Sequence, residues 1–208
     1  MRTVTIASAL AVLLAASSSA MADSRTEQLK GTFVFSGTTV CAVSPAFITP
    51  TSYTPPLGFR ANLTAIGDTF PVTFSIQGTQ TFNGDGTGSI EARVVSLSFG
   101  NQVSGSANDQ QSTPFTYSVD ADGNIMIERG PSRGVFVLGP RTGQETSVSN
   151  IPISVGHLSS DRKSIMYSTF NPAVETVTRL VPGPELVESL RICHRERTAI
   201  RIGSGQDD

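Results

Sequence analysis

The sequence predicts an all-β fold, an antiparallel up-and-down barrel of about eight to ten strands. Segments that alternate apolar and polar residues recur along the chain, a pattern typical of half-buried strands. Clusters of Gly, Asn, Asp and Pro separate these segments at hairpin spacing, and helical periodicity is scarce. Consecutive hairpins without crossover helices favour a closed barrel, and a β-sandwich is the alternative.

The first 22 residues have the features of a signal peptide. Residues 4–16 are mostly Ala, Leu, Val and Ile, and Ala20-Met21-Ala22 supplies the small-x-small pattern before cleavage at Asp23. The apolar run is shorter than the roughly 20 residues that span a membrane, and no second long run follows. We therefore expect a periplasmic or secreted protein with no membrane span after cleavage of residues 1–22.

The rest of the chain is predicted to form one domain. Residues 23–202 have the length of a single barrel, and residues 203–208 should be a disordered tail. The formal net charge of −2 at pH 7 is too small to indicate nucleic acid as a partner. Two of the fifteen basic residues are lysines, so arginine, the better residue for bidentate pairing with carboxylates and phosphates, predominates.

The predicted strands begin with residues 31–43, which place Phe33 and Phe35 on one face. Residues 72–82 follow, and a Gly-rich turn at 83–88 leads to a return strand at 89–99. The apolar phase of this return strand shifts at Val94-Val95, which predicts a β-bulge there. The later predicted strands are 115–119, 125–127, 134–138, 151–155, 165–169, 174–180 and 190–202.

Two long stretches are predicted to be loops. Residues 100–113 are polar and nearly free of apolar side chains, which is typical of a mobile loop. Residues 44–71 carry five prolines together with Phe47, Tyr53 and Phe59, so we expect this loop to contact a ligand or a partner. The aromatic residues expected to line the barrel interior are Phe33, Phe35, Phe74, Phe82, Phe115 and Tyr117.

Cys41 and Cys193 are the only cysteines and lie near the two ends of the mature chain. Export would place them where disulfides persist, and a barrel brings its first and last strands together. We therefore predict one disulfide between them. Cys41 shares the alternation of Phe33 and Phe35, whereas Cys193 lies opposite to the apolar Leu190 and Ile192. Those faces conflict, so we expect a bulge or a strand end near Gly37 or Cys41.

Little in the sequence indicates catalysis. No G-x-S-x-G elbow occurs, and His157 and His194 lack metal-ligand spacing, so no metal and no cofactor is predicted. The remaining cluster of charge is in the last predicted strand. It could hold an anionic ligand or carboxylates of a partner, but we favour a solvated outer face. Its members are Arg191, His194, Arg195, Arg197 and Arg201.

Gly31-Thr32-Phe33, at the start of the first strand and followed by hairpin after hairpin, resembles the lipocalin-like (calycin) barrels. Those barrels begin with a G-x-W strand and carry a basic residue near the last strand that packs over the tryptophan. The resemblance implies that Phe33 takes the place of the tryptophan and Arg191 that of the basic residue. It also implies a cup that holds a small apolar ligand.

Our leading functional hypothesis is an exported, non-enzymatic barrel that binds a small apolar ligand or an envelope component. The alternatives are a barrel enzyme of cyclase or isomerase type, and a structural or secretion-associated protein. The sequence does not distinguish a filled interior from one that holds a ligand.

Overall fold

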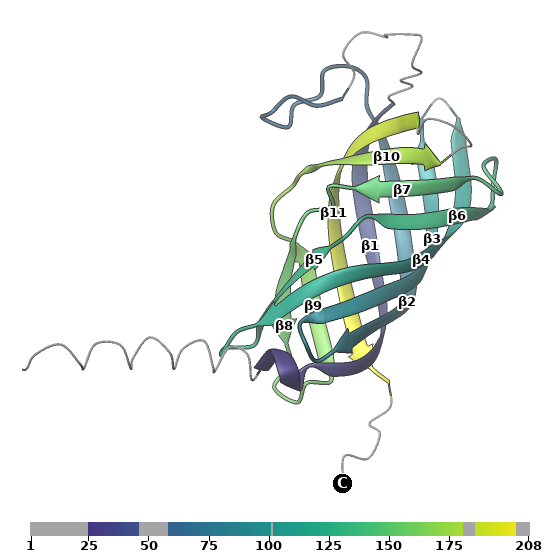
Figure 1. Ribbon diagram of the computed structural model, residues 1–208. Helices are drawn as coiled ribbons and strands as arrows, with labels where there is room; N and C mark the ends of the chain where they lie inside the picture. Colours follow the sequence, from purple (N-terminus) through teal and green to yellow (C-terminus); the bar gives the residue numbers. More distant parts are fainter. Residues whose placement is uncertain (1–24, 46–57, 101, 181–185, 203–208) are drawn as a thin grey trace, which may run out of the picture.

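The computed structural model describes residues 25–45, 58–100, 102–180 and 186–202. These residues form an all-β protein of antiparallel strands (Figure 1), as predicted. Residues 1–22, predicted to be a signal peptide, the predicted tail at 203–208 and the loop residues Phe47 and Tyr53 lie outside the described residues. The strands are β1 Lys30–Pro45, β2 Phe70–Asn83, β3 Thr87–Phe99, β4 Val103–Val119, β5 Asn124–Arg129, β6 Ser132–Leu138, β7 Glu145–Ser149, β8 Ser154–Leu158, β9 Ser164–Thr169, β10 Val174–Leu180 and β11 Leu186–Arg201.

The sheet closes into a ring because β1 pairs with β11 as well as with β2. Three arms of the ring are each broken into two strands by a proline. Pro131 separates β5 from β6, Pro152 separates β7 from β8, and Pro172 separates β9 from β10. Proline has no N–H to donate to a ladder, so breaks at these positions are expected. With each broken arm counted once, eight antiparallel arms follow one another around the ring in chain order.

The broken arms divide the ring into two halves along its axis (Figure 1). In one half, β5, β8 and β9 bridge the carboxyl-terminal parts of β4 and β11. In the other half, β6, β7 and β10 bridge the amino-terminal parts of the same two strands. The two halves have different interiors, and this difference positions the candidate site.

The half that contains β5, β8 and β9 is filled by an apolar core. A helical turn at residues 25–28 lies against its end, where the Tyr117 hydroxyl donates to the Leu29 carbonyl at 2.7 Å. Phe82 packs edge-on against Phe33, Phe115 and Tyr117, with ring centroids 4.9–5.3 Å apart. The other buried apolar members are Leu29, Phe35, Ile76, Ile90, Val119, Ile125, Ile127, Leu158, Ile165, Tyr167 and Ala199.

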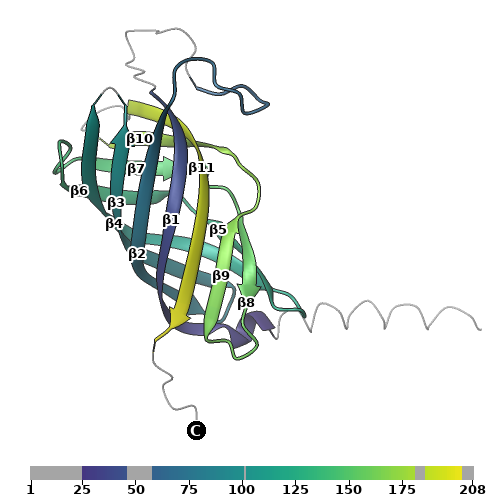
Figure 2. The ribbon, with the colours of Figure 1, turned by 180° about the vertical axis from the view of Figure 1, so that it is seen from behind.

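Strands β1 and β11 lie side by side (Figure 2), and the predicted disulfide joins them. Cys41 and Cys193 are directly opposite in the antiparallel register, with Cα atoms 4.1 Å apart, and the two sulfur atoms are bonded. The expected bulge near Gly37 or Cys41 is wrong, because β1 pairs with β11 without a shift from Phe33 to Pro45. The conflict between faces disappears because the inward face of β11 is not its apolar one.

The bulge predicted at Val94-Val95 is also wrong. The register of β3 against β4 shifts between Ile90 and Ala92 instead, and the strand then alternates without interruption to its end. Leu97 and Phe99 consequently face outward and are 47% and 44% exposed. The serines between the apolar residues face inward.

The predicted mobile loop at residues 100–113 is largely strand. Residues 103–113 belong to β4, which pairs with β3 on one side and with β6 on the other. The segment looked like a loop because it lacks apolar residues, but its inward side chains face a polar cavity rather than a core. Among the described residues, no helix is long and apolar enough to cross a membrane.

Candidate ligand cavity

The half of the ring that contains β6, β7 and β10 encloses a cavity of about 410 Å³. This volume lies within the range of roughly 300–1,000 Å³ that is typical of small-molecule sites. Ile76 separates it from the apolar core, since this side chain belongs to the core and also lines the cavity. Of the described residues that line the cavity, seven are arginines and a single one, Glu188, is acidic.

Strand β11 supplies much of this positive charge, and the interpretation of its arginines as a solvated outer face is wrong. Cys193 points into the ring because it is bonded to Cys41, and residues two apart in a strand share a face. Arg195 and Arg197 therefore point inward and are 6% and 9% exposed. His194 lies on the opposite, outer face, with its side chain 64% exposed.

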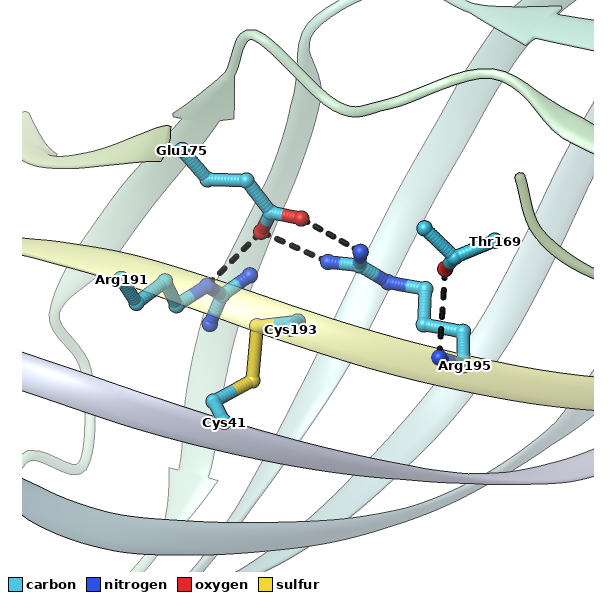
Figure 3. A network of polar contacts seen from close by, with 6 residues as sticks. All are labelled: Cys41, Thr169, Glu175, Arg191, Cys193 and Arg195. Atoms are coloured by element: carbon cyan, nitrogen blue, oxygen red, sulfur yellow. Dashed lines mark hydrogen bonds and ion pairs between the residues drawn. A yellow bond between two sulfur atoms is a disulfide. The ribbon is translucent and has the colours of Figure 1, made fainter. Parts of the chain in front are cut away.

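Glu175 of β10 is the buried counter-ion of this strand (Figure 3). Its side chain is fully buried and accepts hydrogen bonds from Arg191 Nε at 2.9 Å and from Arg195 Nη2 at 2.6 Å. Burial alone would raise the pKa of Glu175, but the charges of Arg191 and Arg195 outweigh it and lower that pKa. One carboxylate thus serves two guanidinium groups beside the disulfide.

In the part of the chain that the structure describes, neither Arg129 nor Arg197 is hydrogen-bonded to a carboxylate. Arg129 is the last residue of β5, at the break before β6, and is 8% exposed. Its Nε and Nη2 and the Nε of Arg197 lack hydrogen-bond partners among the described residues. Burial, followed by the charge of Arg197, lowers the pKa of Arg129 to about 9, and burial also lowers the pKa of Arg197. A buried charge without a partner is costly.

The unpaired Nε and Nη2 of Arg129 are the same two donors with which Arg93 binds a carboxylate. On the outer surface, Arg93 Nε and Nη2 donate to the two carboxylate oxygens of Asp109 at 2.6 and 2.8 Å. This is the bidentate geometry that favours carboxylate and phosphate ligands. Arg129 presents the same pair of donors, buried and unpaired, at the wall of the cavity.

Aromatic rings support the guanidinium groups from behind. Arg129 lies over Tyr167 at 5.6 Å, and Arg197 lies over Phe35 at 5.4 Å. Such cation–π contacts stabilise a buried cation without using its N–H donors. The Tyr167 hydroxyl also donates to Gln80 Oε1 at 2.8 Å, which fixes the ring beneath Arg129 in place.

A second ion cluster lies at the rim of the cavity. Glu188 of β11 accepts hydrogen bonds from Arg179 of β10, with Nε at 2.6 Å, and from Arg141 of the β6–β7 turn. Arg141 also packs over the Phe136 ring at 4.3 Å. These contacts fasten the turn to β11. Unlike Arg129 and Arg197, both arginines of this cluster have a carboxylate partner.

The aromatic residues that we predicted to line a ligand site lie in different parts of the structure. Phe74 lines the cavity. Phe59 forms an isolated bridge with Ala65 outside the strands. Five others belong to the apolar core of the filled half and do not line the cavity: Phe33, Phe35, Phe82, Phe115 and Tyr117.

The basic residue over Phe33 also differs from the expectation. Arg201 lies over this ring at 5.4 Å, whereas Arg191 lies over Phe74 at 5.3 Å. Among the described residues, no group of three or more His, Cys, Asp or Glu side chains is arranged to hold a metal ion. His157, the other histidine singled out, is exposed.

Comparisons with known proteins add little. No family model matches the chain, and no curated protein matches it. Among solved structures, the chain is weakly similar to the enduracididine biosynthesis enzyme MppR in complex with the condensation product of pyruvate and imidazole 4-carboxaldehyde. The identity is 11%, the match covers 82% of this chain and 87% of the other, and the TM-score is 0.15. A likeness at that level supports no conclusion about fold or function.

Proposed function

We propose that this chain is an exported binding protein whose cavity holds a small organic anion. The observation that carries the proposal is the buried, unpaired Nε and Nη2 pair of Arg129 at the cavity wall, with Arg197 Nε beside it. A carboxylate or phosphate group would satisfy these donors and offset the charge. The signal-like segment and the disulfide support a periplasmic or extracellular location.

The rest of the ligand would be largely apolar. Phe70, Val72 and Phe74 of β2 line the cavity together with Val43 of β1. These side chains offer apolar contact but no hydrogen bonds. The small apolar ligand expected from the sequence is thus refined to an acid with an apolar body.

Binding is a better proposal than catalysis for this cavity. None of the described lining residues is a histidine or a cysteine, and the one lining carboxylate, Glu188, is paired with two arginines. General acid–base chemistry needs a group that exchanges a proton near the working pH. Arginines that stay charged at neutral pH bind and orient an anion instead.

The proposal is tested by comparing an acid with a neutral ligand of the same shape. We expect 3-phenylpropanoate to bind and to raise the melting temperature, and 3-phenylpropanamide to bind at least about tenfold more weakly, as for a lost charge-assisted contact. Arg129→Met should remove the preference for the acid, while the surface variant Arg93→Gln retains it. Equal affinity for acid and amide in the wild type would refute the proposal, as would absence of binding by both.

A purely structural role for Arg129 predicts a different effect on stability. If Arg129 served the fold, Arg129→Met would destabilise the ligand-free protein. If it serves a ligand, removal of an unpaired buried charge should leave the ligand-free protein as stable as the wild type or more so. Melting curves of both proteins without added anion separate the two roles.

A further inference from the structure

The walls of the cavity differ strongly in chemistry from strand to strand. Side chains with hydroxyl groups line the wall formed by β3 and β4, whereas guanidinium groups line the wall formed by β10 and β11. Apolar side chains dominate β1 and β2, whereas β6 and β7 form a mixed wall in which Phe136 and Val148 lie among Ser132, Arg133 and Thr146. The serines of the hydroxyl wall are Ser96, Ser98, Ser104 and Ser106.

The order of strands around this half of the ring determines which walls of the cavity face each other. The order is β1, β2, β3, β4, β6, β7, β10 and β11, closed by the pairing of β11 with β1. In a closed ring of eight, strands four positions apart lie across the interior from each other. The serine wall therefore faces the arginine wall, and the apolar wall of β1 and β2 faces the mixed wall of β6 and β7. Phe136 and Val148 supply the apolar contact on that mixed side.

The hydroxyl groups of the serine wall can form hydrogen bonds with a ligand in the cavity. Ser96 lies opposite Ser106 in the β3–β4 register, and their hydroxyl oxygens are 2.7 Å apart. One hydroxyl donates to the other, so the second proton and several lone pairs remain for a ligand. Ser98 lies opposite Ser104 in the same register, which places a second pair of hydroxyls one step nearer the rim.

We infer that the bound anion is a flat ring acid that carries a hydrogen-bonding group, such as a hydroxyl, on the edge opposite its acid group. The ring would lie between the β1–β2 wall and Phe136, with its acid group on Arg197 of β11 and the neighbouring Arg129, and its far edge across the cavity against Ser96 and Ser106. A linear alkyl acid would satisfy the arginines but leave the serine hydroxyls without partners. This inference rests on the proposed binding of an anion and specifies the class of that ligand.

Three acids of similar length test the inference: 3-(4-hydroxyphenyl)propanoate, 3-phenylpropanoate and octanoate. We expect the hydroxylated acid to bind the wild type about three- to tenfold more tightly than 3-phenylpropanoate, the range for one neutral hydrogen bond. The double variant Ser96→Ala/Ser106→Ala should abolish that difference and leave the affinity for 3-phenylpropanoate unchanged. Ser36→Ala, on the exposed face of β1, is the matched control and should keep the difference.

The outcomes separate this inference from the proposed function. If the acids bind through Arg129 but the hydroxyl brings no gain, or the gain survives in the double serine variant, the ring-acid inference is wrong and the anion site stands. Tighter binding of octanoate than of both aromatic acids would also overturn it. If the acids and their amides bind equally, or no acid binds, the anion site itself is wrong and the inference fails with it.

Discussion

Replacing Glu175 by glutamine is expected to destabilise the protein severely. Glu175 is fully buried and is the carboxylate that both Arg191 and Arg195 contact. The amide of Glu175→Gln keeps the shape but leaves two guanidinium groups without a counter-ion in the described part of the chain. Removal of one partner from a buried ion pair costs about 3–5 kcal/mol, because the remaining charge stays buried.

Thermal unfolding under oxidising conditions at pH 7 measures this cost. For a domain of this size each kcal/mol shifts the melting temperature by about 2–4 °C, so Glu175→Gln should melt roughly 6–20 °C below the wild type. The matched control is Asp109→Asn, which breaks a pair whose side chains are 52% and 48% exposed. Exposed pairs contribute about 1 kcal/mol or less. A shift for Glu175→Gln no larger than that of Asp109→Asn would refute the reasoning.

The pH dependence of the difference in melting temperature between wild type and Glu175→Gln provides a second check. The arginines lower the pKa of Glu175 below its usual value of 4.5, so the folded state holds fewer protons than the unfolded state in this range. The stabilisation by the carboxylate is complete above about pH 4.5 and is lost as the pH falls through the pKa of the folded state. The melting temperatures of wild type and Glu175→Gln should therefore converge in acid. A gap that stays constant to low pH would show that Glu175 does not act through its charge.

Two further predictions concern the seam and the site. Cys193→Ser should lower the melting temperature, by at most the roughly 5 kcal/mol that chain entropy assigns to so long a loop, and should abolish the mobility difference between reducing and non-reducing gels. Equal melting of variant and wild type in oxidising buffer would contradict this. The affinity for 3-phenylpropanoate should fall as the pH rises through about 9, where ligand-free Arg129 loses its proton, and calorimetric titrations at pH 7 and pH 10 measure the change. An affinity that does not change between those pH values would mean that the charge of Arg129 does not hold the acid.

The sequence predicts the filled half of the ring well, for a simple physical reason. In that half, apolar residues at alternate positions face a dry interior, so Phe33, Phe35 and Phe82 are buried as their alternation predicts. The hairpin turns were also visible, since Gly84, Gly86 and Gly123 adopt the positive φ that such turns require. The all-β architecture and the antiparallel order follow from these signals, and the disulfide follows from the number of cysteines and their positions in the first and last strands.

The same rule fails where the interior is a polar cavity. In β3, the apolar Val95, Leu97 and Phe99 face outward, and Ser96 and Ser98 line the cavity, which reverses the usual alternation. The assumption that apolar side chains face the interior then requires a bulge at Val94-Val95, and the strand has no bulge there. For the same reason the polar residues 103–113 resembled a loop, although they form the inner and outer faces of a strand.

The disulfide alone is enough to predict which face of the last strand points into the ring. Residues directly opposite in an antiparallel pair lie on the same face of the sheet. If Cys41 shares the inward alternation of Phe33, its partner Cys193 must also point inward, and Arg195 and Arg197 follow two and four residues later. The face of β11 is therefore fixed by a covalent bond rather than by its hydropathy. The bond turns Leu190 and Ile192 to the opposite face and directs Arg195 and Arg197 into the ring, where Glu175 offsets the charge of Arg195 and the proposed anion would offset that of Arg197.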